Sequence, residues 1–105
     1  MIRAYVYYNG ILAGYLLKNR RRYVFLYDRN YAASKNSSIA LNLPKAKRIF
    51  TSANLFPFFQ GLLPEGANKK FYCRQLNINP KDKFSMLLGL AQNETIGRVT
   101  VRRER

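Results

Sequence analysis

Apolar residues alternate with other residues along the first quarter of the chain, which is the pattern of strands that bury one face. In residues 2–8 the alternate positions hold Ile, Ala, Val and Tyr. The next dipeptide, Asn9-Gly10, tolerates the positive φ that a two-residue hairpin requires, so residues 11–17 should return antiparallel to the first strand. Residues 23–27 alternate again. The pattern predicts an antiparallel meander of three strands.

The remainder of the chain predicts one short extended piece, helices and a closing strand. Residues 39–43 alternate up to Pro44, and because proline lacks an N–H we expect this piece at a sheet edge. Helices are expected over about residues 54–63, 64–76 and 80–91. Residues 96–102 form a final basic strand in which Val99 and Val101 share a face. The sequence leaves open whether that strand joins the first sheet.

The last helix has the clearest predicted start. Asn79 can cap its free amides, Pro80 suits the first helical position, and Asp82 adds negative charge to the first turn. Residues 84, 87, 88 and 91 form its apolar stripe. The chain shows no repeat or linker, so we expect one domain over residues 1–105, of class α+β, with a small antiparallel sheet and about three helices packed on it.

The segment 55–66 joins a dense apolar helix face to an abrupt turn. Its large apolar residues fall at i, i+3, i+4, i+7 and i+8, and Pro57 fits only in a first turn. This spacing mostly indicates ordinary core packing. The corner Pro64-Glu65-Gly66 is different, because a buried helix does not need it. We therefore expect the corner to be exposed and available to a partner.

Positive charge is the second large feature. Nineteen Lys and Arg against five Asp and Glu give a net charge of +14 at pH 7, spread over separate clusters. Such a charge speeds encounter with acidic molecules but names none of them. Two interpretations stay open: functional contact with phosphates or an acidic protein surface, and solvated loop charge.

The chain is poor in catalytic side chains. It has no His, five carboxylates and one Cys, so it lacks the residues from which metal sites and nucleophile-base pairs are usually built. We expect no enzyme activity, no metal and no cofactor. Cys73 falls within an apolar helical pattern and is expected to be buried. The absence of a signal peptide pattern and the single Cys indicate a cytoplasmic protein.

Three segments resemble a known family in their order along the chain. Residues 38–44, 58–66 and 95–101 resemble the N-terminal subdomain of HipA-type toxin kinases, and the resemblance extends over nearly the whole chain. It includes the Asn9-Gly10 hairpin with Gly14. Residues 91–94, Arg98 and Ala40 depart from the family pattern, so no family contact is carried over to those positions.

The resemblance implies a fold and a role. In HipA-type kinases the nucleotide loop, catalytic aspartate and metal ligands follow this subdomain, and a chain of this length resembles HipS, the small member of three-part HipB-HipS-HipT systems. It implies an antitoxin that binds and neutralises a separate HipT-type serine/threonine kinase, with a HipB-type helix-turn-helix DNA-binding protein as an associated partner. It implies no kinase activity for the chain itself.

The corner after residue 62 is the predicted kinase contact. Our hypothesis is that it faces the active cleft, where lysines could meet the carboxylates that kinases use for metal binding. The alternative for Glu65 is a charge that stabilises a helix first turn. The predicted partner-binding residues are Leu63, Pro64, Glu65, Gly66, Asn68, Lys69 and Lys70.

Nucleic-acid binding is the rival hypothesis. Tyr5, Tyr7 and Tyr23 could stack on bases while arginines neutralise phosphates, although strand tyrosines more often serve packing. A combined hypothesis places the last strand against operator DNA when the chain is held beside a HipB-type protein. The candidate nucleic-acid contacts are Arg98, Arg102, Arg103 and Arg105.

Overall fold

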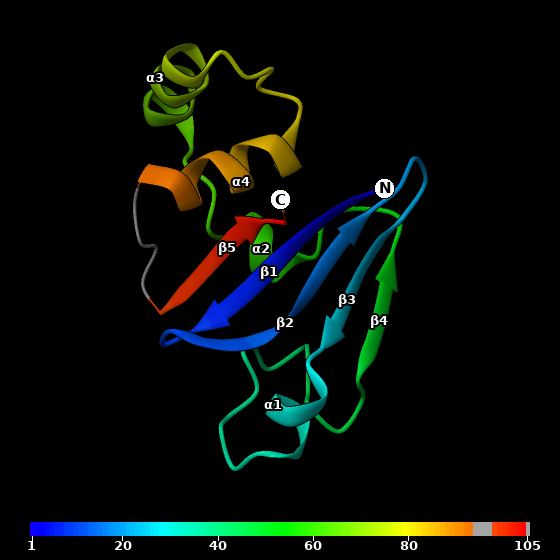
Figure 1. Ribbon diagram of the computed structural model, residues 1–105. Helices are drawn as coiled ribbons and strands as arrows, with labels where there is room; N and C mark the ends of the chain where they lie inside the picture. Colours follow the sequence, from blue (N-terminus) through cyan, green and yellow to red (C-terminus); the bar gives the residue numbers. More distant parts are fainter. Residues whose placement is uncertain (94–97, 105) are drawn as a thin grey trace.

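Five antiparallel strands form the sheet (Figure 1). The computed structural model describes residues 1–93 and 98–104, with the side chains of residues 90–93 outside this description. The strands are β1 (Ile2–Tyr8), β2 (Ile11–Lys18), β3 (Tyr23–Tyr27), β4 (Ile49–Ser52) and β5 (Val99–Arg103), in the order β4-β3-β2-β1-β5. The predicted meander is confirmed, and β5 joins the same sheet beside β1. Residues 96 and 97 of the predicted closing strand lie outside the described residues.

The first hairpin follows from its turn residues. Asn9 and Gly10 have φ of 52° and 79°, and Tyr8 pairs with Ile11 across the turn. The register shifts between Val6 and Tyr7, which places a bulge at Ala13 of β2, opposite these two residues. The two-residue turn predicted from Asn9-Gly10 is therefore confirmed.

The predicted edge piece over residues 39–43 is wrong, because the edge strand is β4. Residues 39–43 fold into a turn in which Leu43 N–H donates to the Ala40 carbonyl at 3.2 Å, and Leu41 is fully exposed. The Tyr27 hydroxyl holds this turn by accepting from Ile39 N–H at 3.1 Å and donating to the Leu43 carbonyl. The apolar residues alternate here because Ile39 and Leu43 are buried in a turn that the Tyr27 hydroxyl holds, and not because the segment pairs as a strand.

Four short helices accompany the sheet. They are α1 (Arg29–Ala33), α2 (Pro57–Gln60), α3 (Gly66–Leu76) and α4 (Lys83–Asn93). The helix predicted over 54–63 is a single turn that starts at Pro57, because Phe56 is extended. Leu62 and Leu63 then continue in tight turns, with their N–H groups donating to the carbonyls of residues 59 and 60.

The predicted start of α4 at Pro80 is also corrected. The helix begins at Lys83, and Asp82 caps it by accepting from Ser85 N–H at 3.0 Å and from the Ser85 hydroxyl at 2.7 Å. Asn79 instead shapes the turn before the helix, since its side chain accepts from Lys81 N–H at 2.9 Å. The predicted apolar stripe is confirmed at Phe84, Leu87 and Leu88, which are buried, while the side chain of Ala91 lies outside the description.

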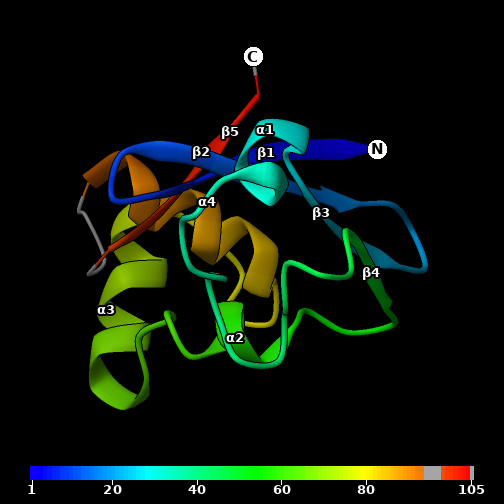
Figure 2. The same ribbon diagram turned by 90° about the horizontal axis from the view of Figure 1, so that it is seen from below.

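The core lies between the sheet and the helices. Figure 2 shows α2, α3 and α4 on one side of the sheet, with α1 at its end. Phe25 of β3 is fully buried and meets Tyr27 and Phe59, with ring centroids 4.8 Å and 5.8 Å away. The predicted packing of this segment is confirmed, since Leu55 and Phe59 are buried and the core also contacts the partly buried Phe58, Leu62 and Leu63, although only residues 57–60 are helical. The opposite face of the sheet has none of the described helices over it.

Candidate partner-binding surface

The predicted corner is exposed between α2 and α3. Glu65 and Gly66 are exposed, whereas Leu63 and Pro64 are half-buried. Gly66 has φ of +60°, a conformation that side chains disfavour, so glycine allows the sharp entry into α3. Glu65 occupies the N-cap position of α3 but its side chain makes no capping hydrogen bond. The expected exposure of the corner is confirmed, and its role in binding stays a prediction.

Helix α3 carries the remaining predicted contacts and stands out from the body of the molecule (Figures 1 and 2). Asn68 and Lys70 are exposed, and Lys69 is half-buried. Cys73 is buried at 4% exposure, which confirms its predicted packing role. The corner and the first turn of α3 therefore form one protruding edge.

Phe71 was missed by the sequence analysis. It lies next to Lys70 on α3 and is 63% exposed, which is unusual for a phenylalanine. The inward side of α3 holds residues 69, 72, 73 and 76, at helical spacing, and Phe71 falls outside that stripe. The position of Phe71 outside this stripe could have predicted its exposure from the sequence. Phe71 adds an apolar anchor to the protruding edge.

The predicted arginines of the last strand do not form one row. Arg102 pairs with Tyr5 and Arg103 with Ala4 across β1, so the two side chains point to opposite faces of the sheet. Arg98, Arg102 and Arg103 are exposed, and Arg105 lies outside the described residues. Arg98 also hydrogen-bonds the Tyr8 hydroxyl, which together with Ser37 holds the pKa of Tyr8 below its usual value. The four candidates therefore offer no continuous basic stripe among the described residues.

The three tyrosines proposed as a base-stacking platform are separated. Tyr5 lies on the face away from the helices, with its ring centroid 6.5 Å from that of Tyr7 and 6.0 Å from that of Tyr15. Tyr23 lies on the helix side, 6.0 Å from the ring of Phe84. Tyr5, Tyr7 and Tyr23 thus cannot stack on one strand of nucleic acid from a common face.

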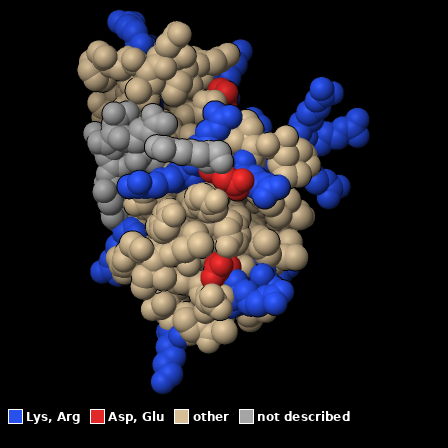
Figure 3. All heavy atoms as spheres, viewed as in Figure 1, with Lys and Arg blue, Asp and Glu red and all other residues tan. Residues whose placement is uncertain are grey.

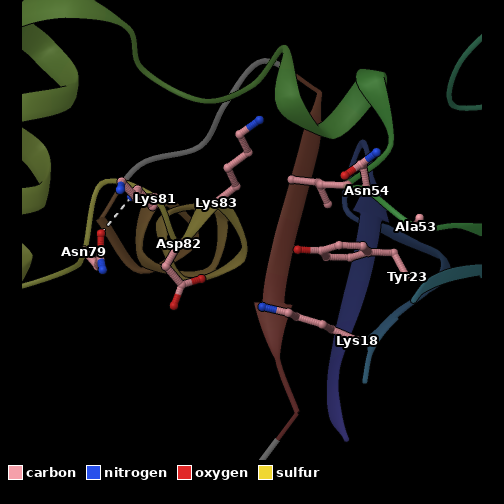
Figure 4. Close-up of a pocket in the computed structure, with 9 residues that line it drawn as sticks. Lys18, Tyr23, Ala53, Asn54, Asn79, Lys81, Asp82 and Lys83 are labelled. Carbon is pink, nitrogen blue, oxygen red and sulfur yellow. Dashed lines mark hydrogen bonds between the residues drawn. The ribbon is translucent and has the colours of Figure 1, made fainter. Parts of the chain in front are cut away.

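A polar cleft of about 450 Å³ lies between the sheet and the start of α4 (Figure 4). Two of its lysines have partners within the fold: Lys83 donates to the Gln60 side chain at 3.0 Å, and the Lys18 ammonium lies 5.7 Å from the ring centroid of Tyr23. Figure 4 shows the lysine side chains pointing in different directions. The cleft is lined by Lys18, Tyr23, Ala53, Asn54, Leu55, Asn79, Lys81, Asp82 and Lys83.

Asp82 in this cleft serves the helix start. Burial acts to raise the pKa of its carboxyl, but the hydrogen bonds from the Ser85 hydroxyl and backbone, with the charge of Lys18, outweigh burial and lower that pKa. The ionised carboxylate is therefore committed to capping α4. The arrangement links α2, α4 and the sheet and provides no convergent set of groups for chemistry.

The described part of the chain contains no grouping of three or more His, Cys, Asp and Glu side chains able to hold a metal ion. None of the helices within it has the length and apolarity needed to cross a lipid bilayer.

Comparisons with known proteins identify the family. Residues 4–102 match the HipA N-terminal domain. An uncharacterized protein of Haemophilus influenzae (strain ATCC 51907 / DSM 11121 / KW20 / Rd) is 31% identical over 100 residues, which cover 95% of this chain and 91% of that protein.

Two further relatives bear on fold and length. The putative kinase Y4mE of Sinorhizobium fredii (strain NBRC 101917 / NGR234) is 27% identical over 84 residues, covering 78% of this chain and only 20% of the putative kinase. A solved N-terminal domain of HipA toxin has the same fold, with a TM-score of 0.76 at 24% identity, covering 100% of this chain and 94% of that domain. The resemblance to the HipA N-terminal subdomain that was inferred from the sequence is confirmed. The chain belongs to the HipA N-terminal domain family.

Proposed function

We propose that this chain is an antitoxin of a HipBST-type system, which binds a separate HipT-type serine/threonine kinase and neutralises it. The observation that carries the proposal is the family match over residues 4–102. The same domain occurs in the Haemophilus influenzae protein, of which this chain covers 91%, and as a fifth of the putative kinase. A domain found in both settings is suited to act on a kinase body in trans.

The protruding edge is the proposed contact with the kinase. Glu65 and Gly66 are exposed at the corner, and Lys70 and Phe71 follow on the exposed side of α3. An exposed phenylalanine is a side chain of the type that is enriched at the centres of protein interfaces. The lysines would meet the carboxylates that hold metal ions in a kinase cleft, and so restrain nucleotide binding or cleft closure. Inhibition is stoichiometric in this mechanism.

The test is autophosphorylation of a HipT-type kinase from the same organism, measured with increasing amounts of the protein. We expect kinase autophosphorylation to reach its minimum when the protein and the kinase are present at about equal molar amounts. Lys69→Glu combined with Lys70→Glu should weaken inhibition at least about tenfold, which corresponds to about 1.4 kcal/mol. The matched control is Arg20→Glu with Lys35→Glu, which makes the same charge change at exposed residues outside the edge. Absence of inhibition at any ratio would refute the proposal.

A basic accessory domain that binds DNA beside a HipB-type regulator is the second candidate. The observation in its favour is that Arg102 and Arg103 are exposed on the edge strand β5. Replacing both by Gln should lower operator affinity of the complex with the regulator and reduce the salt slope by about one to two, if each contacts a phosphate. An unchanged slope would count against direct DNA contact.

A further inference from the structure

The face of the sheet opposite the helices has an apolar centre that extends across the four strands β1 to β4. One row of paired residues crosses the whole sheet in the order Arg102, Tyr5, Tyr15, Leu26, Ile49. In the next row Leu17 and Val24 pair at the centre, with Arg3 and Thr51 at the two ends. An antiparallel sheet with a solvated face normally alternates apolar residues inward with polar residues outward. Here the face away from the helices also has an apolar centre, bordered by Arg3, Thr51, Thr100 and Arg102, and we call it the open face.

The open face is accessible. Its tyrosines and leucines are half-buried, and Ile49 is 54% exposed. Figure 3, seen from this side, shows uncharged surface over much of the sheet, with Lys and Arg side chains at its margin and a few charged groups of both signs between them. Contiguous apolar surface with a polar border marks protein interaction sites in soluble proteins.

The size of the open face fits the centre of an interface. Five strands about 4.8 Å apart and about five residues of 3.3 Å rise give a footprint of roughly 300 Å². A stable interface needs about 800 Å² from each partner, with an apolar centre and a polar rim. The basic margin must therefore supply much of the contact.

Charge decides the occupant. The acids beside the open face are already engaged: Glu104 lies 3.9 Å from Arg3, and Asp28 accepts from the Tyr15 hydroxyl at 2.8 Å while it caps α1. A second copy would bring together two bodies of net charge +14, so their margins would repel. A partner with acidic groups round an apolar centre would complement the margin.

A hollow at the edge of the open face refines this match. It has a volume of about 330 Å³ and is lined by Tyr7, Gly10, Thr100 and Arg102. Arg102 and Thr100 lie on the same side of β5, and the guanidinium of Arg102 is exposed. Guanidinium groups bind carboxylates with two parallel hydrogen bonds. The hollow is therefore suited to one Asp or Glu side chain.

We propose that the open face binds a second protein. That partner has an apolar centre that packs on the open face and an acidic rim that meets the basic margin. One carboxylate of the partner binds Arg102. The protruding edge lies on the helix side of the sheet, so the two surfaces can be occupied at the same time (Figure 2). This inference does not depend on kinase inhibition through that edge.

The first experiment places a photo-crosslinking amino acid at Leu26 in the full chain, expressed in its native host, with Leu41 as the matched control on an exposed loop. We expect crosslinks at Leu26, absent at Leu41, to a protein other than this chain, with the linked peptide in an acidic surface identified by mass spectrometry. Crosslinks only to a second copy, to nucleic acid or to lipid, or none above the control, would overturn the proposal.

The second experiment measures affinity of the purified partner so identified. Arg102→Glu should weaken binding at least tenfold and Arg103→Glu less than threefold, because these neighbouring arginines point to opposite faces of the sheet. Circular dichroism verifies that both variants fold. Equal effects of the two substitutions would overturn the assignment to the open face.

Discussion

At the scale of single residues, Gly14 is the tightest position in the sheet. A Cβ added there would lie 2.5 Å from the Leu26 carbonyl oxygen and 2.9 Å from the Phe25 ring. The backbone oxygen belongs to a paired strand and cannot move aside cheaply. We expect Gly14→Ala to lower the free energy of unfolding by about 1–3 kcal/mol, measured by urea denaturation.

Gly61→Ala is the matched control for that prediction. Its Cβ would meet the nearest backbone oxygens at 3.5 Å, and its φ of −65° is an ordinary helical value. Because alanine restricts the unfolded chain more than glycine does, stability should change by less than about 1 kcal/mol and in the favourable direction. If both substitutions lower the free energy of unfolding equally, the close approach of β2 and β3 is not the reason why position 14 requires glycine.

At the scale of elements, α4 depends on the Asp82 cap. Asp82→Ala removes the acceptor for the Ser85 N–H and hydroxyl and should cost about 1 kcal/mol of stability. Asp82→Asn keeps an acceptor oxygen and should cost less. Thermal unfolding at pH 7 distinguishes the two variants, and equal losses would show that the charge matters more than the cap geometry.

The same cap makes α4 sensitive to acid. The hydrogen bonds from Ser85 hold the pKa of Asp82 below its ordinary value. A lowered pKa means that the ionised form stabilises the fold above the unfolded pKa of about 4, and that this stabilisation is lost as the pH falls further. The stability difference between the native chain and Asp82→Asn should be constant from pH 7 to 5 and shrink below about pH 4. A difference independent of pH would contradict the assigned hydrogen bonds.

The sequence predicted strands correctly where burial of one sheet face was the only cause of the alternation of apolar residues. The strands β1, β2 and β3 alternate because one face packs on the core, and Asn9-Gly10 sets their hairpin. It failed at residues 39–43, whose alternation arises from a turn held by the Tyr27 hydroxyl. The four residues of β4 were missed, because a strand so short, with exposed Ile49 and Thr51, has no distinctive pattern.

At the scale of the whole molecule, the sequence predicted the class and one exposed surface but not the second. The corner could be found because Pro64-Glu65-Gly66 interrupts an apolar helix face. The open face could not, because its residues lie on four strands and only the register brings Tyr5, Tyr15, Leu26 and Ile49 into one row. The exposure of Phe71 could be predicted only from knowing which residues of α3 face inward, and this depends on where that helix begins.

Net charge should make the stability of the whole molecule depend on salt. The chain carries +14 within a radius of gyration of 13.5 Å. The Debye length is about 30 Å at 0.01 M salt and about 10 Å at 0.1 M, so repulsion acts across the entire fold in the first case and is largely screened in the second. We expect the thermal midpoint to rise by roughly 4–8 °C for each kcal/mol of repulsion that NaCl removes.

A variant with lower charge tests whether screening is the cause. Arg20→Gln, Lys35→Gln and Lys81→Gln remove three positive charges from +14 and leave +11, at exposed side chains. If self-repulsion sets the salt response, this variant should have a higher midpoint than the native chain at 0.01 M NaCl and a smaller rise up to 0.2 M. A native midpoint that falls with salt would mean that favourable interactions of the basic clusters within the fold outweigh their repulsion, and a constant midpoint would mean that the two balance. The positive surface would then be part of what holds the domain together, because added salt would weaken those attractions as it screens the repulsion.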